Sequence, residues 1–104
     1  FSLSQPGCLE NSTGPNEKIV YFNIENNGDI KINNFKANID GNIGSTFVTI
    51  PQSVDQSVET KLSFIIDTSG VGTDLGVTLT PMVKAGGITR YCTDKTKAIS
   101  VDCS

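Results

Sequence analysis

The sequence predicts an all-β fold, an antiparallel β-sandwich of about seven strands in a single domain that spans residues 1–104. Apolar residues alternate with less apolar ones, as at Val20, Phe22 and Ile24, which is the period of a half-buried strand. Gly, Asn and Pro interrupt these runs at short intervals, as turns between strands do. The 104 residues, 37% of them apolar, are enough for one hydrophobic core and contain no repeat or internal linker.

Three strands are expected in the first 40 residues, at 3–9, 17–25 and 30–40. Asn26-Asn27-Gly28-Asp29 supplies the positive φ angles of a tight turn, so 17–25 and 30–40 are expected to be neighbours in one antiparallel sheet. Within 30–40 the apolar residues change parity near Asn33-Asn34, which indicates a bulge or bend.

The remaining strands are expected at 46–50, 62–66, 75–83 with a continuation over 88–92, and 99–103. Pro51 ends the first of these strands. Pro81 has no N–H to donate to a ladder, so it predicts a sheet edge or a bulge within 75–83. Ala85-Gly86-Gly87 indicates either a kink within one long strand or a turn.

Composition excludes several classes of function. The chain contains no His, so it has no Ser-His-Asp or Cys-His arrangement and no His-containing zinc site. The formal charge is −3 and the basic residues are scattered, so nucleic acid is not an expected partner. No apolar run approaches the roughly 20 residues that cross a bilayer. The N-terminus does not read as a signal peptide, so Phe1 is either a mature end or the cut edge of a longer protein.

The three cysteines predict one disulfide and one leftover thiol in an exported protein. In a sandwich whose strands alternate in direction, Cys8 and Cys103 finish at the same end and Cys92 lies at the other. We therefore predict a Cys8–Cys103 disulfide. Asn11-Ser12-Thr13 is an N-glycosylation acceptor pattern, so Asn11 is expected to be exposed and glycosylated.

No candidate catalytic or metal site is convincing, and no cofactor is expected. Asp67-Thr68-Ser69-Gly70 follows an apolar strand as in aspartic proteases, but Ser69 interrupts the Asp-Thr-Gly pattern and turn chemistry explains the segment. Asp67, Ser69 and Asp74 offer oxygen ligands to calcium without the acidic density of an EF-hand loop, so calcium binding by this loop stays open. Cys92 has no neighbouring base that would make it a nucleophile.

Residues 20–41, V-Y-F-N-I-E-N-N-G-D-I-K-I-N-N-F-K-A-N-I-D-G, resemble the immunoglobulin-like β-sandwich domains of archaeal surface proteins. These are the type IV pilins, the archaellins and the archaellum stator proteins. The matching positions are Val20, Phe22, Ile24, Asn27, Gly28, Phe35, Ile39 and Gly41. The resemblance implies an immunoglobulin-like fold and an extracellular location at the cell surface, in a pilus or archaellum. Contact with a membrane is then expected only through a segment that these 104 residues do not contain.

The expected function is that of a non-enzymatic structural or protein-interaction domain of an archaeal surface filament or adhesion apparatus. Its expected partners are other surface or filament proteins. The strand at 46–50 carries no charge, so Phe47, Val48 and Ile50 are expected to form a contact edge that accepts a partner strand. The alternatives are a bacterial-type pilin, since Cys92 and Cys103 have a spacing similar to its C-terminal disulfide loop, and a carbohydrate- or calcium-binding module of a secreted protein.

Overall fold

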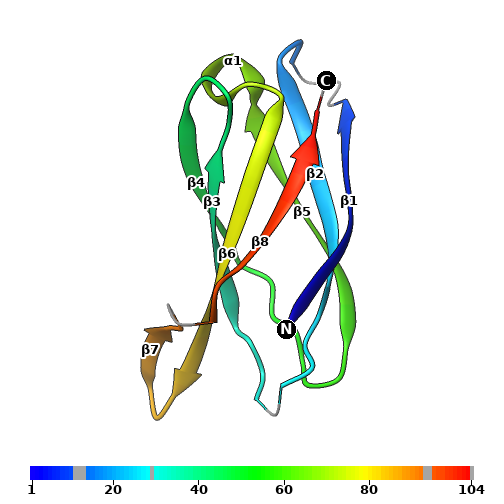
Figure 1. Cartoon of the computed structure of the whole chain (residues 1–104). Helices are drawn as coiled ribbons and strands as arrows, with labels where there is room; N and C mark the ends of the chain where they lie inside the picture. The colour runs from blue at the N-terminus through cyan, green and yellow to red at the C-terminus, as the bar shows by residue number, and fades with distance from the viewer. Residues whose placement is uncertain (11–13, 29, 93–94, 104) are drawn as a thin grey trace.

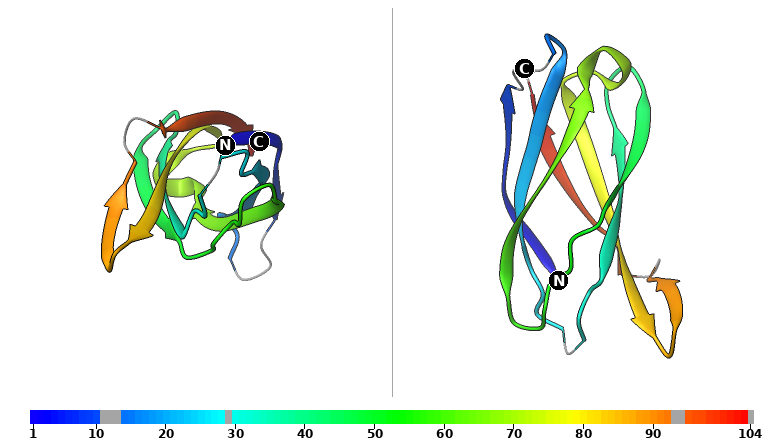
Figure 2. Two further views of the ribbon diagram at one scale, coloured as in Figure 1. Left: turned by 90° about the horizontal axis from the view of Figure 1, so that it is seen from below. Right: turned by 180° about the vertical axis from the view of Figure 1, so that it is seen from behind.

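The computed structural model describes residues 1–10, 14–28, 30–92 and 95–103 and confirms the all-β sandwich (Figures 1 and 2). In chain order its elements are β1 (Ser2–Glu10), β2 (Glu17–Glu25), β3 (Asn34–Asp40), β4 (Ser45–Ile50), β5 (Glu59–Asp67), α1 (Thr68–Val71), β6 (Asp74–Ala85), β7 (Ile88–Tyr91) and β8 (Lys97–Asp102). The predicted strand at 17–25 is confirmed over its whole length. The other strands differ from their predicted ranges at one end or both.

Two antiparallel sheets pack face to face, as in immunoglobulin-like sandwiches. The smaller sheet has the strand order β1-β2-β5, and the larger has β4-β3-β6-β7 with β8 also paired to β6. β8 pairs with Asp74–Leu79 of β6 and β7 with Met82–Ala85, so β6 has β3 on one side and these two strands in succession on the other. At the level of β8 the larger sheet is therefore four strands wide, whereas the smaller sheet is three strands wide.

The core lies between the sheets and is formed by alternate residues of the strands, as the period of two predicts. From the smaller sheet it takes Val20, Phe22, Ile24, Leu62 and Ile66. From the larger sheet it takes Phe35, Ala37, Ile39, Ile50, Leu75, Val77, Leu79 and Val101. The Phe22 and Phe64 rings meet edge to face, with their centroids 6.3 Å apart.

The segment from Asn26 to Asn33 crosses between the sheets, so the prediction of a hairpin between residues 17–25 and 30–40 is wrong. β3 begins only at Asn34, and the parity change near this point marks the end of the crossover. Ile32 instead forms an isolated bridge with Val54. The buried Asn26 side chain holds the crossover, because its Nδ2 donates to the carbonyls of Ile30 (2.9 Å) and Val54 (3.0 Å).

β6 is a central strand, yet it contains Pro81. The Pro81 carbonyl accepts a hydrogen bond from the Cys92 N–H at 2.9 Å. Because the N–H and C=O of one strand residue point to the same side, the missing N–H of Pro81 falls where β6 changes partner from β8 to β7. Pro81 therefore lies at the gap between β8 and β7 along one side of β6, and not at an outer edge of the sheet.

The β6–β7 hairpin projects beyond the body of the sandwich (Figure 1). Its turn is formed by Gly86 (φ 59°) and Gly87 (φ 79°), and two successive positive φ angles match the right-handed twist of the flanking strands. Ala85-Gly86-Gly87 is therefore a turn and not a kink. The molecule measures 43 × 23 × 22 Å along its principal axes.

One flank of the sandwich is closed by the predicted disulfide between Cys8 and Cys103, whose Cα atoms are 5.3 Å apart. The predicted pairing is therefore confirmed. Its premise also holds, because β7 is a short side ribbon and the other strands alternate in direction (Figure 1). Cys92 is the free cysteine. The described part of the chain includes no helix with the length and apolar character needed to span a membrane.

Candidate functional site

The flank opposite the disulfide contains a groove between β4, β5 and α1. Its walls are Ser45, Thr46 and Val48 from β4, Ile65, Ile66 and Asp67 from β5, and Gly70 and Val71 from α1. The cavity volume is about 320 Å³, at the lower end of the range of about 300–1,000 Å³ for ligand pockets. Seven of these eight residues carry no charge, so the groove suits an apolar or uncharged group.

β4 is an edge strand that pairs with β3 and with no other strand of the described chain. At the adjoining turn, the Gly41 N–H donates to the Gly44 carbonyl at 2.8 Å. Hydrogen-bonded and non-bonded pairs alternate along an antiparallel ladder, so the backbone groups of Ser45, Phe47 and Thr49 point away from β3. β4 therefore presents unpaired N–H and C=O groups on its outer side, where neither a charged residue nor Pro protects the edge.

The three side chains predicted to form a contact edge have different environments. Phe47 is 63% exposed on the outer face of the larger sheet, where the Lys36 Nζ lies 5.1 Å from its ring centroid. Val48 is half-buried and lines the groove. Ile50 is 4% exposed, so its prediction as a contact side chain is wrong. Strand alternation explains this result, because Val48 and Ile50 share the inward parity and only Val48 lies where the opposite sheet leaves it uncovered.

Ile65 belongs to this site and was missed by the sequence analysis. It is 55% exposed, because its parity is opposite to that of the inward-facing Leu62, Phe64 and Ile66. In the register of the smaller sheet it lies beside Ile19, which in turn lies beside Leu9. The sequence parity indicated that Ile65 is exposed, but nothing in the sequence indicated that it lies near β4.

α1 closes the upper end of the groove, and Asp67 caps this short helix. The Asp67 Oδ1 accepts hydrogen bonds from the Ser69 hydroxyl (2.6 Å) and the Ser69 N–H (2.9 Å). These bonds, the hydroxyl bond first, hold the pKa of the Asp67 carboxyl below its ordinary value of 3.8. Asp67 is thus the N-cap of α1, in agreement with the turn interpretation of the Asp-Thr-Ser-Gly segment.

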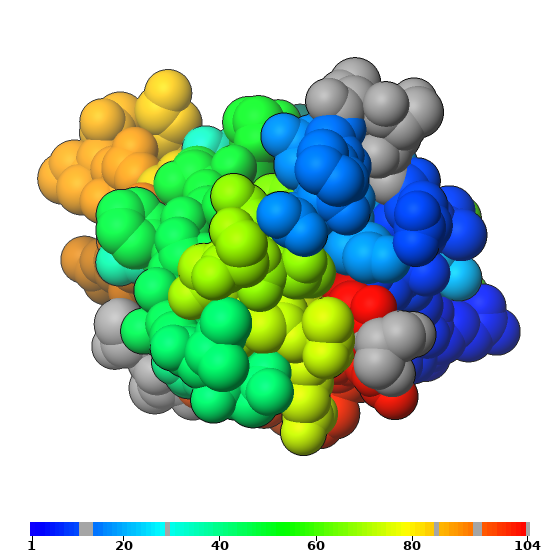
Figure 3. Space-filling model, turned by 90° about the horizontal axis from the view of Figure 1, so that it is seen from above, coloured from blue at the N-terminus to red at the C-terminus, as the bar shows by residue number. Residues whose placement is uncertain are grey.

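The turn between β3 and β4 packs directly on α1 (Figure 3). The Ile43 N–H donates to the Val71 carbonyl at 3.1 Å, and the Asn42 Oδ1 accepts from the Thr73 N–H at 3.1 Å. A Cβ atom on Gly41 would overlap the Val71 carbonyl, so only Gly fits at this close approach. These contacts fix the position of α1 relative to β4 and so define the groove.

A second cavity, of about 300 Å³, lies at the other end of the sandwich. Its walls include Ile30, Ile32 and Pro81, with the half-buried Cys92 and the exposed Lys95 also in the lining. The Asn26 side chain that lines it is already engaged in hydrogen bonds with the backbone. The cavity therefore offers an apolar wall, a thiol and the Lys95 ammonium group, and its described lining residues include no carboxylate.

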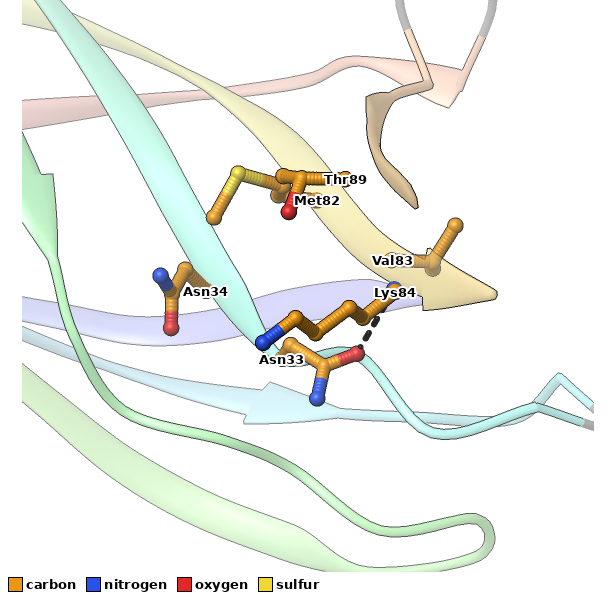
Figure 4. Close-up of a pocket in the computed structure, with 6 residues that line it drawn as sticks. All are labelled: Asn33, Asn34, Met82, Val83, Lys84 and Thr89. Atoms are coloured by element: carbon orange, nitrogen blue, oxygen red, sulfur yellow. Dashed lines mark hydrogen bonds between the residues drawn. The ribbon is translucent and has the colours of Figure 1, made fainter. Parts of the chain in front are cut away.

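A third and smaller hollow, of about 190 Å³, lies at the base of the β6–β7 hairpin and is shown in Figure 4. The Lys84 side chain lies alongside Asn33, whose Oδ1 accepts a hydrogen bond from the Lys84 N–H at 2.9 Å. Met82 and Asn34 form another part of its wall. The lining contains amide, hydroxyl and ammonium groups but no carboxylate or thiol, and the Asn33–Lys84 hydrogen bond ties the segment before β3 to β6.

The remaining predicted site residues are the glycosylation site and the candidate calcium ligands. Asn11, the expected glycosylation site, lies outside the described residues. Asp74 donates its backbone N–H to the Asn42 Oδ1 at 3.4 Å, and Asp67 serves as the cap of α1. Within the described chain no group of three His, Cys, Asp or Glu residues is placed to hold a metal ion.

No protein-family model matches the chain, and a search of curated proteins finds no match. Among solved structures, the fold is similar to a crystal structure of a protein from Archaeoglobus fulgidus, with a TM-score of 0.54. The alignment covers 95% of this chain and 94% of that one at 14% sequence identity. At this identity the similarity shows the fold alone.

Proposed function

We propose that the protein is a non-enzymatic structural or interaction domain of an archaeal surface filament or adhesion apparatus, and that it binds another surface protein through the edge of β4. The observation that carries the proposal is the unprotected edge itself. β4 has six uncharged residues, a free outer row of backbone groups and the exposed ring of Phe47. An edge of this kind pairs readily with an extended segment of another chain.

The disulfide supports an extracellular location. Disulfides form and persist in oxidising environments and are rare in the cytosol. The Cys8–Cys103 bond encloses nearly the whole chain, with a sequence separation of 95 residues. N-glycosylation at Asn11 belongs to the same proposal, and the intact mass of protein from its native host would test it.

The composition and the role of Asp67 support a non-enzymatic function. The chain has no His, which is the usual general base near neutral pH. The carboxylate most similar to a protease aspartate is engaged by Ser69, and the neighbouring Thr68 hydroxyl donates to the Asn16 carbonyl at 2.9 Å. Both groups stabilise the junction between β5 and α1.

Capture from an envelope extract of an archaeal host, with the immobilised domain as bait, tests the proposal. Thr49→Pro removes an N–H from the free side of β4 and leaves the ladder to β3 in place, so we expect it to abolish capture of a filament or surface-layer protein. Thr49→Ala keeps the N–H and should capture as the wild type does. Equal capture by Thr49→Pro and Thr49→Ala would rule out the β4 edge, and peptide hydrolysis lost in Asp67→Asn would replace the proposal with a protease.

A further inference from the structure

The two sheets differ in width on the flank that carries the groove. β1 packs against β8 at the disulfide flank, whereas β4 and β5 make less extensive contact at the other flank. In constant-type immunoglobulin sandwiches the fourth strand pairs with the fifth and completes a four-stranded sheet. Here β4 pairs with β3 instead, so the position beside β5 that faces β4 is empty of strand in the described chain.

The burial of the inward-facing side chains of β4 shows that the smaller sheet covers only part of this strand. Its inward-facing residues change from exposed at Thr46 to half-buried at Val48 and 4% exposed at Ile50. A strand covered by an opposite sheet would bury all three positions. The groove of about 320 Å³ lies at the uncovered end, between Val48 and Ile66.

The edge of β5 offers backbone groups to this position. The ladder between β2 and β5 is flanked by bonds from the Asn26 N–H to the Val58 carbonyl (3.0 Å) and from the Thr68 N–H to the Asn16 carbonyl (2.9 Å). Both bonds continue the register of the ladder, so the even-numbered residues of β5 bond to β2. The N–H and C=O groups of Ser63 and Ile65 therefore point toward the groove side.

We infer that the groove is the seat of an extended segment of a partner protein, which adds antiparallel to β5 as the fourth strand of the smaller sheet. Alternate apolar side chains of this segment would enter the groove between Val48, Ile66 and Val71. Antiparallel pairing places its N-terminal end beside Asp67, the one charged residue of the lining, so a basic residue is favoured there. This inference rests on the proposed interaction function and adds a second strand position, on β5, to the contact at the β4 edge.

The probe is a synthetic peptide, Lys-Thr-Val-Thr-Val-Thr-Val-Thr, added to the ¹⁵N-labelled wild-type protein. We expect amide exchange to slow at Ser63 and Ile65, because the peptide carbonyls accept their N–H groups. The amides of Phe47 and Thr49 should keep their exchange rates. The same peptide with Pro in place of its second and third Thr cannot donate along the strand and serves as the control peptide.

Two variants of the protein, each with a matched control, test the proposed strand position beside β5. Gly70 lines the groove and a Cβ there meets no atom within 4 Å, so Gly70→Leu adds a side chain at the groove wall without a backbone clash and should weaken peptide binding about tenfold or more. Gly76→Leu is the matched control, because Gly76 lies on β6, away from the groove, where a Cβ makes only an ordinary contact of 3.8 Å with the Asp40 carbonyl. Ser63→Pro removes a donor of the free edge, and Ser63→Ala retains it, so only the former should lose binding.

The outcomes separate the inference from the function on which it rests. Slowed exchange at Ser63 and Ile65, together with loss of binding in Gly70→Leu, supports the β5 seat. Slowed exchange at Phe47 and Thr49 instead overturns the β5 seat and leaves the β4 contact standing. The absence of any peptide binding at millimolar concentration would overturn the strand seat, while capture that depends on the N–H of Thr49 would still support the proposed function.

Discussion

At the scale of single residues, a few polar side chains join segments that the sheets leave apart. The buried Asn26 amide bonds two backbone carbonyls of separate segments, and its Oδ1 accepts the Gly28 N–H at 3.1 Å. Asp67 plays the corresponding part at the other end of the molecule, where it ends β5 and begins α1. Both residues fall in turn-like stretches of the sequence. In each, the side-chain oxygen accepts a hydrogen bond from the backbone N–H two residues ahead, as in an Asx turn.

The lowered pKa of Asp67 leads to a prediction about acid stability. Its folded pKa lies below the ordinary 3.8, so its stabilising effect is fully present above pH 3.8 and is lost as the pH falls through the folded value. Ser69→Ala removes the hydroxyl donor, which is the largest cause, and should raise the pKa of Asp67 toward 3.8. Carboxyl ¹³C NMR during an acid titration measures this change.

Glu10 provides an internal reference for the same titration. The hydrogen bond and charge of Lys18, whose Nζ lies 2.7 Å from the Glu10 Oε1, lower the pKa of Glu10 from 4.5. Ser69→Ala should leave the pKa of Glu10 where it is, and Ser53→Ala, at an exposed position, should change neither group. An unchanged Asp67 titration in Ser69→Ala would show that the helix cap does not depend on the hydroxyl.

At the scale of elements, the turn between β3 and β4 and the single turn of α1 support one another. α1 has four residues, too few for a helix that is stable alone, so its position depends on the contacts from Asn42 and Ile43. Close approach of the backbones is possible because Gly41 has no Cβ. The groove is a product of this contact, and its shape therefore depends on a turn remote from α1 in sequence.

Gly41→Ala tests this contact. The added Cβ overlaps the Val71 carbonyl, so α1 or the turn must shift, and we expect the free energy of unfolding to fall by about 1–3 kcal/mol. Urea denaturation measures the change. Gly76→Ala places a Cβ in ordinary contact and should cause no loss, so an equal effect of the two substitutions would remove close approach as the reason for Gly41.

At the scale of the whole molecule, the two flanks of the sandwich differ in how they are closed. The flank of β1 and β8 is closed by a covalent bond between the ends of the chain, and Cys103 is buried there. The flank of β4 and β5 has two edges and a groove. This asymmetry places the groove and both proposed contact strands on the flank without the disulfide.

The disulfide is expected to contribute about 2–4 kcal/mol by restricting the unfolded chain. The double variant Cys8→Ser, Cys103→Ser should lose that amount in urea denaturation without reductant. Cys92→Ser keeps the disulfide and should unfold as the wild type does. Peptide mapping without reductant that found Cys92 linked to Cys103 would contradict both the pairing and the strand arrangement.

Much of the fold was predictable from the sequence, because it depends on local alternation. The parity of Leu62, Phe64 and Ile66 identified the inward face of β5, and the same parity implied that Ile65 faces solvent. The error at Asn26 has a physical cause. Asn-Gly chemistry is typical of a tight turn in many contexts, whereas the sheet that the next strand joins is decided by packing across the core.

By itself the sequence determined the class of fold and the approximate positions of the strands, because side-chain period is a property of neighbouring residues. The expected alternation of strand direction along the chain then predicted the pairing of Cys8 with Cys103. Only the tertiary structure decided that β4 joins β3 and not β5, that Ile50 is covered while Val48 is partly open, and that α1 closes a groove. These features depend on contacts between segments distant in the chain, whose free energies are set by burial and not by local pattern. The candidate binding site is formed by such contacts alone.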